Sequence, residues 1–92
     1  MSITFGQLLG EVLTGARKQS GHRQCDIARQ MGFKSPTSLS KIETGSTEIT
    51  VLQLYSLCEL VEISPLHVLT RAEAMVKAIE AEGKPVLFAR NF

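Results

Sequence analysis

The sequence predicts a single all-α domain, and three observations support this. The chain has 92 residues, enough for one hydrophobic core and too few for two. Its apolar residues recur mainly at the three- and four-residue spacing of a helix face. Residues that cap helices stand where these segments begin, and Gly or Pro stands near their ends. With 43% hydrophobic and 21% charged residues, the composition excludes disordered, collagen-like and coiled-coil chains.

The first helix is expected from Phe5 to Gln19. Thr4 and Gln7 have the spacing of a capping box, in which two side chains satisfy backbone N–H groups at the start of a helix. Ser20 and Gly21 provide the stop. The apolar residues of this segment fall on one helix face: Phe5, Leu8, Leu9, Val12, Leu13 and Ala16.

Two short helices with a tight connection follow. The first is expected from Gln24 to Met31 and ends at Gly32. The second is expected from Pro36 to Thr44, with Ser35 as a hydroxyl cap and Gly45 as the stop. The side chains available for burial are Cys25, Ile27, Ala28 and Met31 in the first helix and Leu39 and Ile42 in the second.

A fourth helix is expected from Val51 to Val61, opened by a second capping box of Thr50 and Gln53. A cap and a proline, Ser64-Pro65, start the next helical segment. Either this segment ends near Leu69 and a separate helix capped by Thr70 and Glu73 runs to Glu82, or one bent helix spans both. The stripe of the fourth helix consists of Val51, Leu54, Leu57, Cys58 and Val61.

The C-terminal tail, Val86 to Arg90, is apolar enough to form a short strand. A lone strand has no ladder to join in a helical domain. We therefore expect it to pair with a second copy of the chain or to pack as an irregular tail.

Several function classes lack their signatures. Cys25 and Cys58 are far apart and are expected to be reduced, and His22 and His67 are isolated, so neither a metal nor another cofactor is indicated. No nucleophile triad, carboxylate pair or phosphate loop points to an enzyme. No apolar run spans a bilayer and no secretion signal is present, so we expect a cytoplasmic protein without membrane contact.

Positive charge is concentrated in one part of the chain. The net charge is +1, but residues 1–46 carry +3 and residues 47–92 carry −2. Between Arg17 and Lys41 there are six basic residues and one acidic residue, Asp26. This distribution fits either an anionic partner or an ordinary solvated face.

The two short helices fit a helix-turn-helix, in which the second helix enters the DNA major groove. The order and spacing of further residues point to one family. They are Gln24, Ile27-Ala28 with Met31-Gly32, the run from Leu39 to Gly45, the amphipathic segment from Leu52 to Leu60, and Ser64-Pro65-Leu66 with Leu69. On these residues, positions 5–69 resemble the DNA-binding domain of phage repressor and Cro-type regulators, a five-helix fold also called the xenobiotic-response-element family. The fold predicted is thus an all-α, five-helix repressor-like domain with a C-terminal helix and a short tail.

The resemblance implies roles for individual residues. It places Thr37, Ser38 and Lys41 at base edges, and these positions also point outward from the third helix. In this family an arginine late in the first helix pairs with the glutamate before the glycine that ends the third helix. The resemblance therefore implies a structural ion pair of Arg17 and Glu43. The residues expected to contact DNA phosphate are Arg23, Gln24, Lys34, Ser35, Thr44, Ser46 and Thr47.

The sequence therefore predicts a DNA-binding transcriptional regulator, a repressor that binds a near-palindromic operator as a homodimer. Residues 1–69 would form the DNA-binding domain and residues 70–92 an extension for dimerisation, unless its helix merely packs on its own core. A protein-interaction module on the same fold, such as an antitoxin or antirepressor with a regulatory protein partner, is the alternative. The residues expected to form the dimer contact are Met75, Val76, Ile79, Val86 and Phe88.

Overall fold

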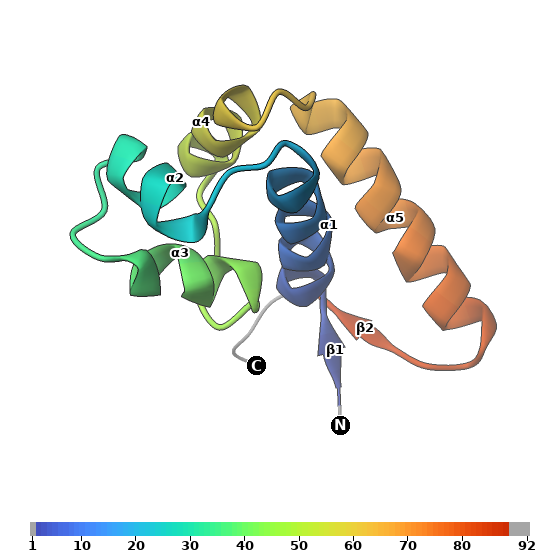
Figure 1. The fold of residues 1–92 in the computed structure, drawn as a ribbon. Coiled ribbons are helices and arrows are strands. Elements are labelled where there is room, and N and C mark those ends of the chain that lie inside the picture. Colours follow the sequence, from blue (N-terminus) through green and yellow to red (C-terminus); the bar gives the residue numbers. More distant parts are fainter. Residues whose placement is uncertain (1, 89–92) are drawn as a thin grey trace.

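A computed structural model describes residues 2–88, which form five helices and two short strands (Figure 1). The predicted all-α fold is confirmed, with a minimal sheet added to it. The elements are β1 (Ile3–Thr4), α1 (Phe5–Gln19), α2 (Gln24–Gln30), α3 (Pro36–Glu43), α4 (Val51–Leu60), α5 (Pro65–Ala81) and β2 (Val86–Leu87).

Helix α1 is the central element, with α5 along one side and α3 on the other (Figure 1). It begins as the sequence predicts: the Thr4 hydroxyl accepts from the Gln7 backbone N–H at 3.1 Å, and the Gln7 side chain accepts from the Thr4 N–H at 3.0 Å. Helix α4 starts with the same arrangement at Thr50 and Gln53. Local capping chemistry thus determines where the two helices begin.

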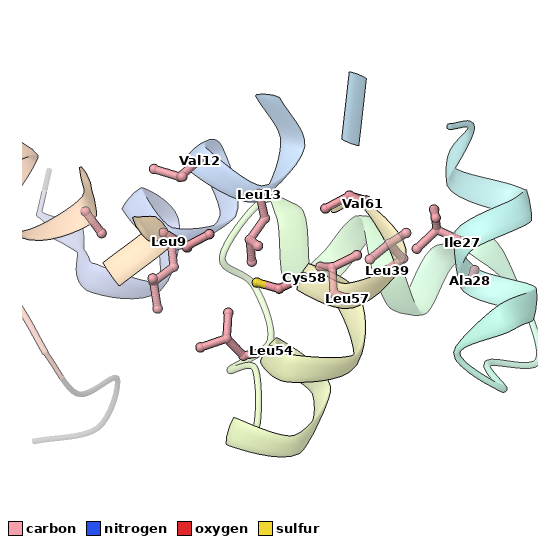
Figure 2. Packing of buried hydrophobic residues seen from close by; sticks show 12 residues of the cluster. Leu9, Val12, Leu13, Ile27, Ala28, Leu39, Leu54, Leu57, Cys58 and Val61 are labelled. Atoms are coloured by element: carbon pink, nitrogen blue, oxygen red, sulfur yellow. The ribbon is translucent and has the colours of Figure 1, made fainter. Parts of the chain in front are cut away.

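One hydrophobic core joins all five helices (Figure 2). Leu13, Ile27, Leu39, Leu57 and Val68 come from five different helices, and each is completely buried. Ala72 of α5 is also completely buried in this core, so the segment after residue 69 packs against the rest of the chain.

Helix α1 approaches the end of α3 at two glycines. A Cβ atom on Gly10 would overlap the carbonyl oxygen of Glu43 and would lie 2.8 Å from that of Ile42. Gly45 has a φ of +79°, and a Cβ atom there would lie 2.7 Å from the backbone of Gln7. Both positions require glycine, because any side chain would push α1 and the end of α3 apart.

The expected lone strand has a partner within the chain. Strand β2 pairs in parallel with β1, with Ile3 opposite Val86 and Thr4 opposite Leu87. The expectation that this tail lacks a strand to join was wrong, because β1, directly before α1, was not recognised. Residues 89 and 90 of the expected strand lie outside the described residues.

The structure decides between the two alternatives for the segment after Ser64. Helix α5 is continuous, and the Thr70 hydroxyl donates to the Leu66 carbonyl at 2.8 Å instead of capping a new helix. Three smaller expectations differ from the structure. Ser35 and Ser64 precede their helices but make no side-chain cap hydrogen bond. Val51 is 73% exposed and does not belong to the buried stripe of α4. Cys25 is exposed, because a helix of two turns buries only Ile27 and Ala28.

Within residues 2–88, none of the helices has the length and apolar character needed to cross a membrane.

Candidate nucleic-acid interface

Helices α2 and α3 form a compact pair with a tight connection. Ile27 and Ala28 of α2 and Leu39 of α3 are buried in the common core, and Figure 2 shows them there. Ile42 anchors the second turn of α3 and is 4% exposed. With its apolar side held in the core, α3 turns its polar residues outward, as the second helix of a helix-turn-helix does.

The three residues predicted to read bases lie on α3. Thr37 and Lys41 are exposed and one helical turn apart, and Ser38 between them is half-buried. Their hydroxyl groups donate and accept hydrogen bonds, and the lysine ammonium donates. These three side chains can therefore form hydrogen bonds with both donors and acceptors on base edges.

The residues around the end of α3 also face solvent. Thr44, Ser46 and Thr47 are all exposed. The Thr44 hydroxyl lies 3.3 Å from the Lys41 carbonyl oxygen, to which it donates, and 3.1 Å from the Ser46 hydroxyl. These short polar side chains form a second outward-facing group, next to the predicted base-reading residues.

The connection between α2 and α3 contributes Lys34 and Ser35. Both are exposed, and they line one cleft together with Arg29 of α2. The Ser35 hydroxyl is not used in capping, so it is available to a ligand.

A buried polar network fixes α3 against α1 and α2. The guanidinium of Arg17 donates from Nε to Glu43 Oε2 at 2.6 Å and from Nη2 to Oε1 at 3.1 Å. Its Nη1 donates to the His22 carbonyl at 2.9 Å, and Gln24 Nε2 donates to Glu43 Oε1 at 2.7 Å. Arg17 and Glu43 are each 7% exposed. The structure thus brings the predicted ion pair together and adds two partners that the sequence did not indicate.

The position of Gln24 differs in one respect from the expectation. Its side chain is half-buried and one amide N–H is directed to Glu43 rather than to solvent. An amide carries two N–H groups, so the second can still donate to a phosphate.

Arg23 lies in a charged cluster that the sequence analysis did not identify. Asp26 Oδ2 accepts from Arg23 Nε at 3.0 Å, and Asp26 Oδ1 accepts from Arg29 Nη2 at 2.8 Å. The hydrogen bond from Arg23 is the main cause of a lowered pKa of the Asp26 carboxyl. The i, i+3 spacing of opposite charges on either side of Asp26 was a usable signal.

The residues predicted for dimerisation gather around α5 and β2 but differ in exposure. Val76 and Val86 are each 7% exposed and pack with Leu8 in a second cluster. Met75 and Ile79 are half-buried at the edge of that cluster. Phe88 is 65% exposed, and its ring centroid lies 5.2 Å from that of Phe5. Met75, Ile79 and Phe88 therefore remain accessible to a partner, whereas both valines already have neighbours within the chain.

The described residues contain no group of three His, Cys, Asp or Glu side chains arranged to hold a metal ion. Cys25 and Cys58 are both free thiols. Burial raises the pKa of the Cys58 thiol, which favours its neutral form.

Comparisons with known proteins agree with this geometry. A family model described as helix-turn-helix matches residues 15–68. A crystal structure of the clp gene regulator ClgR from C. glutamicum is 28% identical, with a TM-score of 0.71 over 77% of this chain and 91% of that chain. A second crystal structure of ClgR from Corynebacterium glutamicum is 25% identical, with a TM-score of 0.79 over 90% and 87% of the two chains. Among curated proteins no match is found. The resemblance inferred from the sequence is thereby confirmed.

Proposed function

The chain belongs to the Cro/C1-type helix-turn-helix family of DNA-binding transcriptional regulators, and we propose that it acts as a homodimeric repressor on a near-palindromic operator. The observation that carries this proposal is the setting of α3. Leu39 and Ile42 hold it in the core, and Glu43 ties it to Arg17, while Thr37 and Lys41 face solvent.

In this proposal α3 enters the major groove, and its outward residues set the sequence preference. Thr37, Ser38 and Lys41 contact base edges. The phosphate contacts are Arg23, Gln24, Lys34, Ser35, Thr44, Ser46 and Thr47. Such contacts release counterions, so affinity falls as salt rises.

In this proposal the protein regulates genes by binding DNA in the cytoplasm, and it catalyses no reaction. The related structures belong to a protein described as a clp gene regulator. That description supports gene regulation for this chain.

The first test recovers DNA fragments that bind the purified protein. The protein is incubated with sheared genomic DNA at physiological salt, and the bound fragments are sequenced. Lys41→Ala is the test variant, and Arg71→Ala near the start of α5 is the control, since both are exposed basic residues on helices. We expect an inverted repeat that is lost only with Lys41→Ala. Equal enrichment by both variants would contradict the role of Lys41, and enrichment of a sequence without an inverted repeat would contradict the dimeric operator.

The proposed dimer uses the face formed by α5 and β2. Two copies would place their α3 helices in successive major grooves, about 34 Å apart. Truncating the chain after Glu82 would not test the dimer contact alone, because it also removes Val86, which pairs with Ile3 of β1. The exposed Phe88 allows a milder test, in which Phe88→Ser weakens the dimer in sedimentation experiments.

A matched variant examines the other exposed apolar face. Leu52 and Tyr55 on α4 are 78% and 58% exposed. If the double variant Leu52→Ser/Tyr55→Ser dissociates the dimer and the single variant Phe88→Ser does not, the interface lies on α4. A monomer for the unsubstituted protein at all concentrations would refute the dimer.

The same α4 face favours a second candidate function, a module that binds a regulatory protein. Val51 adds to the exposed apolar surface at the start of this helix, and such surfaces mark interaction sites. Substitution of Arg23, Lys34 and Lys41 by alanine separates the two functions. It should abolish DNA binding and leave a complex with a protein partner intact.

A further inference from the structure

The acidic residue Asp26 lies among basic residues on the side of the molecule assigned to DNA. Its carboxylate uses one oxygen for each of two arginines, Arg23 at 3.0 Å and Arg29 at 2.8 Å. The two arginine side chains are 77% and 75% exposed, and that of Asp26 is 31% exposed. The cluster therefore presents two guanidinium groups to solvent and one negative charge between them.

Ion pairs this exposed are weak and open readily, because water solvates both partners well. A phosphate group offers a guanidinium the same kind of anionic oxygens as a carboxylate. Asp26 and a DNA phosphate therefore compete for the same donors on Arg23 and Arg29.

The position of Arg29 supports this competition. Arg29 lines one cleft with Lys34 and Ser35, which connect α2 to α3. Both of these neighbours are proposed phosphate contacts. Arg23, at the other end of α2, is a proposed phosphate contact as well. The cluster thus spans α2 between two places where the DNA backbone is expected.

We infer that Arg29 is an additional DNA-backbone contact and that Asp26 restrains DNA affinity by holding Arg23 and Arg29. The inference rests on the proposed mode of DNA binding. In free protein the cluster carries a net charge of +1. On DNA both arginines turn to phosphates, and Asp26, left near the backbone, opposes binding to every sequence. The restraint therefore lowers non-specific affinity and leaves base reading to α3.

The test measures binding to duplex DNA of random sequence at a series of salt concentrations. Asp26→Asn keeps the shape of the side chain and removes its charge. We expect it to bind on the order of threefold to tenfold more tightly at low salt. Arg29→Gln should bind more weakly, with the slope of log affinity against log salt reduced by about 0.9 for each bound subunit, or about 1.8 for the proposed dimer.

The control variants carry the same chemical changes away from α2. Glu59→Gln on α4 and Arg71→Gln on α5 alter exposed residues, and we expect each to bind random DNA within about twofold of the unsubstituted protein. Circular dichroism verifies that all four variants are folded.

Two outcomes would overturn the inference, and they are distinguishable. If the unsubstituted protein binds DNA with a salt-dependent affinity that neither Asp26→Asn nor Arg29→Gln alters, Asp26 and Arg29 have no such roles and the proposed function stands. If the folded, unsubstituted protein binds no DNA at any salt concentration, the proposed function fails and the inference fails with it.

Discussion

Replacing Gly10 by alanine tests whether the close approach of α1 to α3 holds the fold together. A Cβ atom at this position would overlap the Glu43 carbonyl oxygen and would lie 2.7 Å from the Glu43 carbonyl carbon. These neighbours are backbone atoms, so no side chain can rotate away to relieve the contact. Helix α1 and the end of α3 must separate instead.

The expected magnitude combines two opposing effects. Overpacking in a core costs about 1–3 kcal/mol, and a backbone clash places Gly10→Ala at the upper end of that range. Alanine is favoured over glycine within a helix by roughly 1 kcal/mol. The net loss of unfolding free energy is then about 2 kcal/mol, or roughly 10 °C in melting temperature for a domain of this size.

Gly15 provides the matched control on the same helix. A Cβ atom on Gly15 would meet nothing within 4 Å, so only the helix preference changes. Gly15→Ala should therefore stabilise the protein by about 0.5–1 kcal/mol. Urea denaturation followed by circular dichroism measures both variants. If Gly10→Ala is as stable as Gly15→Ala, the close approach does not exist in solution and the reasoning is refuted.

Three further predictions concern other parts of the chain. Arg17→Ala leaves the buried Glu43 without its positively charged partner and should cost about 3–5 kcal/mol, whereas Lys41→Ala should change stability by less than about 0.5 kcal/mol; equal melting temperatures would contradict the structural role of the pair. Glu62 has a φ of 59°, so Glu62→Gly should relieve left-handed strain and raise stability by about 0.5–1 kcal/mol in thermal melts, and a loss of stability would argue against that conformation. A thiol reagent should modify the exposed Cys25 rapidly and the buried Cys58 only on unfolding, and equally fast reaction of both thiols in native protein would disprove the burial of Cys58.

Local chemistry made most of the fold predictable. The capping boxes at Thr4 and Thr50 involve residues three positions apart, and helix periodicity is equally local, so sequence alone places the starts of α1 and α4. The pairing of Arg17 with Glu43 came from family resemblance, since two charges 26 positions apart carry no local signal.

What the sequence did not predict depends on contacts between distant segments. Strand β1 has two residues, and its partner Val86 lies near the other end of the described chain. No periodicity can be recognised in a strand so short. Cys25 was misplaced for a related reason, because a helix of seven residues is too short for its pattern to separate the buried side from the exposed one.

The contacts that stabilise the domain also orient its proposed reading surface. Gly10 and Gly45 bring α1 against the end of α3, and Arg17 binds Glu43 at that same end. Thr37 and Lys41 lie on the outward side of the same short helix. A shift of α1 relative to α3 therefore moves the base-reading side chains together with the core. Because specific contacts tolerate little displacement and phosphate contacts tolerate more, Gly10→Ala should reduce operator affinity more than affinity for random DNA, even at temperatures where the variant is fully folded.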